Sequence, residues 1–178
     1  MLILAISGSL RAASANTSLL RTIAGIAPAG VTVTLYDGLD DLPHFSPERD
    51  IANPPVAVSA LRTQLRAADA VLICTPEYAH GIPGVLKNML DWTVSSGEFV
   101  DKPTGVITAA TEGAFAHTSL LETLRMVSAH RVEGASLLIP LVRTKVMPNG
   151  EITDLPTAQA VQAVLNALIY AVTCQSPA

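Results

Sequence analysis

Residues 68–92, ADAVLICTPEYAHGIPGVLKNMLDW, combine a short apolar run, a loop rich in proline and glycine, and a segment of helical periodicity. The run Ala70–Thr75 contains no charged residue and predicts a fully buried β-strand. Pro83 lies where the first position of a helix is expected. Apolar residues then recur at helical spacing, at Val85, Leu86, Met89, Leu90 and Val94. The order strand, loop, helix is typical of a parallel sheet covered by helices.

The same alternation of short apolar runs and helical segments extends in both directions along the chain. We expect further strands at Leu2–Ser7, Val31–Tyr36, Pro103–Ala110 and Ala135–Val142. We expect a first helix that ends at Pro28 and Gly30 and carries four apolar residues on one face, namely Leu19, Leu20, Ile23 and Ile26. Further helices are expected over Val56–Ala67, Ala114–Ala129 and Thr157–Thr173. Five strands alternating with five helices imply right-handed crossovers. The predicted fold class is α/β, a doubly wound five-stranded parallel sheet in three layers, with residues 1–178 as a single domain.

A polar, proline-rich loop over residues 37–55 separates the second expected strand from the second helix. Its length exceeds that of an ordinary connection, so we expect it to act as a lid or an interface segment. Asp37, which opens the loop, is interpreted as a turn residue, because the chain lacks the GxGxxG motif of dinucleotide enzymes.

Composition limits the classes of partner. The net charge is -4 and only 11 residues are Lys or Arg, which argues against a nucleic-acid partner. Hydrophobic residues make up 49% and aromatic residues 4%, so the core should be aliphatic. The opening MLILAIS lacks a charged n-region, and no run approaches the roughly 18 apolar residues of a membrane span. We therefore expect a cytoplasmic protein without a membrane partner.

Cysteine and histidine patterns give no sign of a metal site. Cys74 and Cys174 show no CxxC spacing and are interpreted as free thiols, with Cys74 buried at the end of a strand. The histidines at positions 44, 80, 117 and 130 show no ligand spacing. We expect no bound metal.

Ligands of doubly wound sheets bind outside the carboxyl ends of the strands. Three loops are therefore candidates: the first loop, Gly8–Ser18; the second loop, Pro76–Gly81; and the third loop, Thr111–Phe115. The first loop, GSLRAASANTS, joins a strand to a helix and offers hydroxyl groups, one amide and one guanidinium. Backbone N–H groups and the helix dipole add to these, so the loop predicts a phosphate site. The alternative is that Ser14 or Asn16 only caps the helix while Arg11 is solvated.

The second loop is fixed by proline at both ends. Pro76 and Pro83 restrict the backbone, and Gly81 and Gly84 permit close approach of another group. We expect the peptide groups of Glu77–His80 to be free to bind a planar heterocycle, which Tyr78 could cover. The alternative for Tyr78 is that it only packs against neighbouring side chains. Trp92, on the following helix, is interpreted as a packing residue or a subunit contact.

Three motifs in order resemble one family: GSLR followed by Ser14 and Asn16, ADAVLICTPEY at 68–78, and GIPGVLKNMLDW at 81–92. The chain resembles, over nearly its whole length, the NADPH-dependent FMN reductases of flavodoxin-like fold, which include quinone, azo-dye and chromate reductases. The resemblance implies strand order 2-1-3-4-5 and FMN as cofactor. It implies hydride transfer from NADPH or NADH through FMN to a small acceptor: a quinone, an azo dye, a metal oxyanion or free flavin. A flavodoxin-type electron carrier, or a reductase using FMN as a dissociable substrate, are the alternatives.

The resemblance also assigns residues by matching positions. The family's cradle for the FMN phosphate corresponds to Ser9, Arg11, Ser14, Asn16, Thr17 and Ser18, and its ring-binding loop to Pro76, Glu77, Tyr78 and Ala79. Thr111 and Gly113 fall in the third loop, where many members carry Gly-Gly-Xaa-Arg and this chain has neither the second glycine nor the arginine. Ala79 replaces a common asparagine. The helix with Lys87, Asn88, Asp91 and Trp92 matches one that often forms a dimer, so a homodimer or homotetramer is expected; no catalytic side chain is implied.

Overall fold

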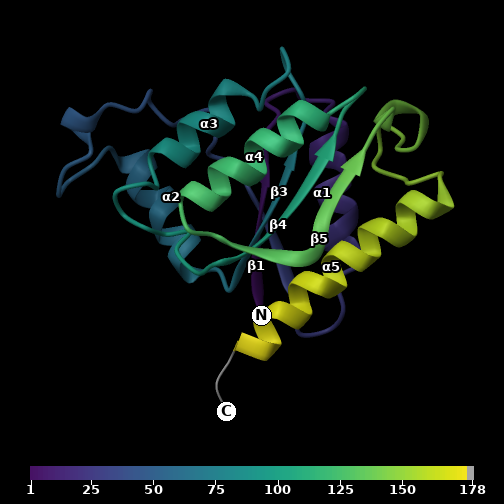
Figure 1. Ribbon diagram of the computed structural model, residues 1–178. Helices are drawn as coiled ribbons and strands as arrows, with labels where there is room; N and C mark the ends of the chain where they lie inside the picture. Colours follow the sequence, from purple (N-terminus) through teal and green to yellow (C-terminus); the bar gives the residue numbers. More distant parts are fainter. Residues whose placement is uncertain (176–178) are drawn as a thin grey trace.

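The computed structural model describes residues 1–175 and contains one five-stranded parallel sheet (Figure 1). Its strands are β1 Leu2–Ser7, β2 Thr32–Tyr36, β3 Ala70–Thr75, β4 Pro103–Ala109 and β5 His130–Ile139. They lie in the order β2-β1-β3-β4-β5, and each neighbouring pair is parallel. The predicted doubly wound sheet and its strand order are confirmed.

Helices cover both faces of the sheet (Figure 1). They are α1 Ala15–Gly25, α2 Val56–Ala67, α3 Gly84–Asp91, α4 Ala114–Met126 and α5 Leu155–Gln175, and short 3-10 turns lie at Pro47–Arg49 and Val142–Thr144. One core cluster contains buried side chains of α2, α3 and α4, and the other contains those of α1 and α5. The three layers follow from this division.

Side-chain alternation along the central strands explains why their sequences are apolar throughout. In β3, Val71 and Ile73 belong to the core on the α2, α3 and α4 side, whereas Leu72 and Cys74 belong to the core on the α1 and α5 side. All four are fully buried. Because successive side chains of a strand point to opposite faces, a strand covered on both faces has no solvent-facing position.

The predicted bounds of the fifth strand, Ala135–Val142, are wrong: β5 spans His130–Ile139. The strand lies at the edge of the sheet, and Arg131 and Glu133 are exposed on it. Gly134 has a φ of +80° beside a register shift in the ladder with β4. These polar residues and the bulge interrupt the apolar pattern that identified the other strands. The strand therefore starts earlier than its apolar run.

The third helix is shorter than predicted. It spans Gly84–Asp91, so Pro83 precedes it as the N-cap residue instead of being its first residue. Val94 lies beyond the helix and is 62% exposed, contrary to its predicted place on the apolar stripe. The hydroxyl of Thr93 donates to the Leu90 carbonyl at 2.8 Å, which satisfies one of the acceptors left at the helix end.

The 37–55 loop is fixed to the body of the domain. Trp92 is fully buried and its indole N–H donates to the Pro43 carbonyl at 2.8 Å. Asn88 accepts from the backbone N–H of Phe45 at 2.8 Å. Arg62 and Asp50 form a buried ion pair at 2.7 Å. Packing is therefore confirmed for Trp92, and the loop is an anchored segment in this structure.

The last helix has enough length and apolar character to cross a membrane, with a mean hydropathy of 1.3 over its Leu155–Cys174 part, of which 28% is buried. In the structure, however, one side of α5 packs against the sheet. Val161, Leu165 and Leu168 are buried there together with side chains of β4 and β5. The helix therefore supplies part of the core.

The segment of residues 142–152, within the connection between β5 and α5, is held against α1. Ser18 donates its hydroxyl to the Pro148 carbonyl at 2.9 Å, and Thr22 donates to the Gly150 carbonyl at 2.7 Å. Gly150 has a φ of +90°, and a Cβ atom there would lie 2.6 Å from Thr22 Oγ1 and 2.7 Å from the Ser18 carbonyl oxygen. Both the backbone conformation and the close approach require glycine.

We expect Gly150→Ala to lower the free energy of unfolding by about 2–4 kcal/mol, because it adds overpacking to an unfavourable φ. Gly30→Ala is the matched control: Gly30 has a φ of +86° but nothing within 4 Å of its Cβ position. The control should cost only about 1–2 kcal/mol. Urea unfolding measures both variants, and equal losses would contradict the close approach of this segment to α1.

Candidate functional site

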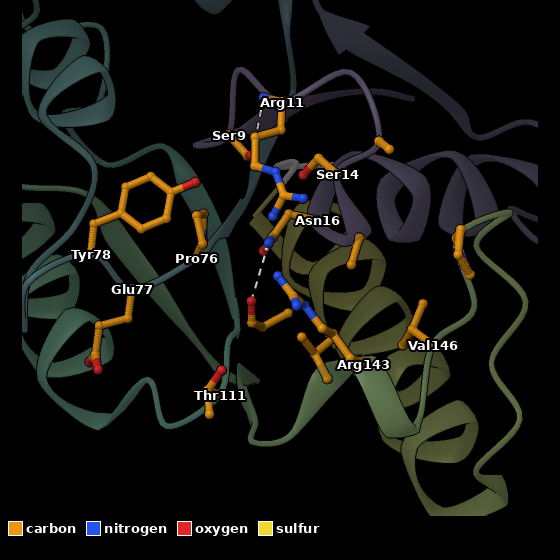
Figure 2. Close-up of a pocket in the computed structure, with 15 residues that line it drawn as sticks. Ser9, Arg11, Ser14, Asn16, Pro76, Glu77, Tyr78, Thr111, Arg143 and Val146 are labelled. Atoms are coloured by element: carbon orange, nitrogen blue, oxygen red, sulfur yellow. Dashed lines mark hydrogen bonds between the residues drawn. The ribbon is translucent and has the colours of Figure 1, made fainter.

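A pocket of about 410 Å³ opens at the carboxyl edge of the sheet (Figure 2). Its wall combines the loops after β1, β3 and β4 with the segment after β5: Ser9, Arg11, Ala13, Ser14, Ala15, Asn16, Pro76, Glu77, Tyr78, Ala109, Thr111, Val142, Arg143, Val146 and Pro148. The volume lies within the range of small-ligand sites. The three loops selected from the sequence therefore meet at one place.

The structure brings most of the predicted site residues to this pocket, namely Ser9, Arg11, Ser14, Asn16, Pro76, Glu77, Tyr78 and Thr111. The other predicted residues lie next to it. Thr17 hydrogen-bonds to Ser7 through their hydroxyl groups at 2.7 Å, and the Ser18 hydroxyl is used by the 142–152 segment. Ala79 follows Tyr78 in the second loop, and Gly113 is the N-cap residue of α4. Their roles in binding a cofactor stay predictions.

The first loop delivers the N-terminus of α1 to the pocket. Ser14 is the N-cap residue, and its hydroxyl oxygen accepts from the backbone N–H of Thr17 at 3.3 Å. The capping role considered for Ser14 is thus confirmed. The N–H groups of Ala15 and Asn16 come first in the helix, where no intrahelical acceptor is available. The positive end of the helix dipole and these donors favour an anion beside Ser14.

Asn16 fixes this helix end to the sheet. Its side-chain N–H donates to the Ala109 carbonyl at 3.1 Å, and its side-chain oxygen accepts from the Cys74 thiol at 3.2 Å. Burial raises the pKa of the Cys74 thiol, so Cys74 stays protonated and acts as a donor. The predicted core role of Cys74 is confirmed, and both cysteines are free. Asn16 positions the first loop and has one remaining N–H for a ligand.

Two arginines point into the pocket from opposite sides (Figure 2). Arg11 comes from the first loop, and Arg143 comes from the 3-10 turn after β5. Neither side chain forms an ion pair within residues 1–175. Arg143 was not predicted, because only the loops after β1, β3 and β4 were considered. The sequence does contain one indication of Arg143: it follows a fifth parallel strand, whose carboxyl end lies at the same edge of the sheet as the pocket.

The second loop is a tight turn. Tyr78 and Gly81 exchange two backbone hydrogen bonds, at 2.9 and 3.0 Å, and the two residues between them have positive φ, 48° for Ala79 and 57° for His80. This is the arrangement of a type I′ turn. The expectation that all peptide groups from Glu77 to His80 are free is wrong for Tyr78, whose N–H and carbonyl are both used by Gly81. The backbone N–H groups of Ala79 and His80, inside the turn, take no part in these two hydrogen bonds.

The start of α4 is fastened to the second loop. A carboxylate oxygen of Glu77 accepts from the backbone N–H of Ala116 at 2.8 Å, which satisfies a donor in the first turn of α4. The rings of His80 and Phe115 stack with centroids 4.3 Å apart. Figure 2 shows the Glu77 carboxylate directed away from the two arginines. The second and third loops therefore form one connected wall.

Glu77, His80 and Glu112 bring one potential metal-ligand atom each to within 4.8 Å of one another. No ligand spacing in the sequence identifies this group, because Glu112 belongs to a different loop from Glu77 and His80. The Glu77 carboxylate already binds the first turn of α4, and the other two side chains are exposed. The absence of a bound metal stays a prediction.

His117 joins α4 to strands β4 and β5. Its Nδ1 lies 2.9 Å from Thr108 Oγ1, and its Nε2 lies 2.9 Å from Ser136 Oγ. Burial lowers the pKa of His117, so the neutral ring is favoured in the folded chain.

Comparisons with known proteins agree on one family. A model of the NADPH-dependent FMN reductase family matches residues 1–143. The chain is 33% identical over 172 residues to an NAD(P)H-dependent FMN reductase of Pseudomonas aeruginosa, covering 93% of this chain and 92% of that protein. It is 32% identical over 169 residues to a quinone reductase of Escherichia coli, with coverages of 90% and 89%. The solved flavoenzyme NAD(P)H:(acceptor) oxidoreductase FerB from Paracoccus denitrificans matches with a TM-score of 0.78 and 25% identity over 97% of both chains.

The lowered pKa of His117 predicts a pH-dependent stability. The unfolded chain takes up a proton near the ordinary histidine value of 6.5, before the folded chain does. This contribution to stability is therefore complete above about pH 6.5 and is lost as the pH falls below it. Thermal unfolding between about pH 7.5 and 5.5 should show a smaller decrease for His117→Gln than for the wild type. Parallel pH profiles would contradict the assignment.

Proposed function

Because the chain belongs to the NADPH-dependent FMN reductase family and is an FMN-dependent NAD(P)H oxidoreductase, we propose that FMN binds in the pocket at the carboxyl edge of its sheet. The observation that carries this proposal is the meeting, in one pocket, of the α1 N-terminus, the Arg11 guanidinium and the turn at Tyr78. The first two suit a phosphate, and the third suits the edge of a planar ring.

The residues of the pocket fit FMN by their chemistry. Arg11 has no ion-pair partner within residues 1–175, and a charge-assisted bond to a phosphate oxygen would satisfy it. Ser9 adds a hydroxyl group close to the same helix end. Pro76 and Thr111, from the second and third loops, line another part of the pocket and have small side chains. A site for flavin mononucleotide requires an anion-binding end for the phosphate and a flatter end for the ring.

The protein residues bind and orient, and no acidic or basic side chain needs to transfer a proton. Bound FMN supplies the redox chemistry, accepting hydride from NADPH or NADH and passing electrons to the acceptor. Arg11 and the α1 N-terminus fix the phosphate end. The turn at Ala79 and His80 would hold the ring end, because two backbone hydrogen bonds between Tyr78 and Gly81 close it.

We propose a quinone as the acceptor class. Tyr78 is 49% exposed at the pocket, and Phe115, stacked on His80, is 55% exposed next to the second loop. Exposed aromatic rings near a flavin offer a surface on which another planar ring can stack. Relatives named quinone reductase support this choice. Azo dyes, metal oxyanions and free flavin are the competing acceptors. Rates of NADPH oxidation measured with each acceptor under the same conditions give their order of preference.

Assembly and location are part of the same proposal. A homodimer or homotetramer is expected from the resemblance, although Asn88 and Trp92 of the matching helix serve the 37–55 loop within the chain. Light scattering on the purified protein gives the number of subunits. A cytoplasmic location agrees with the use of NADPH or NADH as reductant.

The activity is tested by anaerobic spectroscopy. Purified protein should retain a flavin absorbance band after gel filtration, lose the band on addition of NADPH or NADH, and regain it on addition of a quinone. Steady oxidation of NADPH by quinone with no second protein present excludes a flavodoxin-type carrier. Loss of the flavin on gel filtration would favour FMN as a dissociable substrate.

Removing the guanidinium of Arg11 tests the phosphate end of the site. Arg11→Ala should weaken FMN binding by about 10- to 100-fold, because one charge-assisted contact is lost. The measurement is a fluorescence titration of apoprotein with FMN. Arg21→Ala is the control, since Arg21 is exposed further along α1 and does not line the pocket. Equal FMN affinities in the two variants would contradict the assignment of Arg11.

A further inference from the structure

We propose that Arg143 is a second phosphate-binding residue, which faces Arg11 across the pocket and binds the same phosphate monoester. The inference rests on the proposed function and goes further, because Arg143 lies outside the three sequence motifs on which the resemblance rests. Figure 2 shows the Arg143 side chain reaching into the pocket toward Asn16, so that its guanidinium faces that of Arg11.

The backbone that carries Arg143 is fixed to the sheet. Arg143 belongs to the 3-10 turn Val142–Thr144, and the side chain of Val142 is buried in the core beneath α5. The N–H of Leu141 donates to the Thr111 carbonyl, and the N–H of Val142 donates to the Ala110 carbonyl, each at 3.1 Å. The guanidinium therefore starts from a defined position beside the end of β4.

The same segment is also fixed to the helix that begins at the phosphate site. Ser18 and Thr22 of α1 donate to the carbonyls of Pro148 and Gly150. The close contact at Gly150 leaves no space between the segment and α1. The segment that carries Arg143 is thus joined directly to α1. This explains how an exposed side chain can contribute to a defined binding site.

The charges favour a doubly ionised phosphate. Arg143 forms no ion pair within residues 1–175, and neither does Arg11. The one carboxylate of the pocket wall, Glu77, is bound to Ala116 and directed away from both arginines. Two like charges that share a pocket are unfavourable until an anion lies between them. A phosphate monoester carries a charge of about -1.5 to -2 at pH 7, which two guanidinium groups balance.

Two phosphate-bearing molecules enter this pocket under the proposed function. FMN carries a terminal monoester, and the nicotinamide nucleotide carries a diphosphate and, in NADPH, a further monoester. The FMN phosphate is favoured, because both guanidinium groups lie on the side of the pocket where α1 begins (Figure 2). Binding of the nicotinamide nucleotide by Arg143 is the competing outcome of the test.

The experiment titrates full-length apoprotein with FMN and with riboflavin, which lacks the phosphate, and follows flavin fluorescence. Arg143→Gln should weaken FMN binding by about 10- to 100-fold and leave riboflavin binding unchanged. Arg143→Lys keeps a positive charge and should lose less. Lys145→Gln is the matched control, since it removes one positive charge from the same segment without lining the pocket. Circular dichroism checks that each variant is folded.

The outcomes separate this inference from the proposed function. A wild-type apoprotein that binds FMN no more tightly than riboflavin overturns both the FMN phosphate site and the role of Arg143. A wild type that prefers FMN, with unchanged FMN affinity in Arg143→Gln, overturns only the role of Arg143. If the FMN affinity is unchanged and the KM for NADPH rises in Arg143→Gln, the residue binds the nicotinamide nucleotide and the inference is again wrong.

Discussion

The pocket depends on the buried side-chain amide of Asn16, which joins the first turn of α1 to the ends of two strands. One end of the amide binds the Ala109 carbonyl at the end of β4, and the other accepts from Cys74 near the end of β3. An unpaired buried polar group costs about 1–3 kcal/mol, so both contacts are maintained together. The direction of α1 follows from them, and with it the position of the Ser14 cap and of the anion-binding helix end.

The sequence was sufficient to predict the fold wherever a strand is covered on both faces. Runs such as Ala70–Thr75 have no polar position and are easily recognised, and their alternation with helical segments determines the doubly wound order. The exception is instructive. The edge strand His130–Ile139 faces solvent on part of its length and includes a bulge at Gly134, so its first half lacks the signal on which the other predictions depended.

The candidate site was predictable to the extent that its residues lie in motifs. Ser9, Arg11 and Tyr78 line the pocket as predicted. Arg143 could not be found in this way, because it reaches the pocket through tertiary contacts of the 142–152 segment with α1. The geometry of the second loop was also hidden, since Ala79 and His80 adopt a turn that usually contains asparagine or glycine. An asparagine at the position of Ala79 would suit this conformation, whereas alanine adopts it under strain.

The bonds from Ser18 to Pro148 and from Thr22 to Gly150 span 130 and 128 residues of sequence. As the chain leaves the ribosome, α1 is therefore synthesised long before the segment that hydrogen-bonds to it. A nascent chain that ends before this segment has the part of the pocket formed by the first loop and α1, but lacks the part formed by residues 142–148. A ligand that contacts both α1 and this segment stabilises only a chain in which both are folded, because it binds that form and not its precursors. Occupancy of the pocket therefore requires synthesis to have passed this segment.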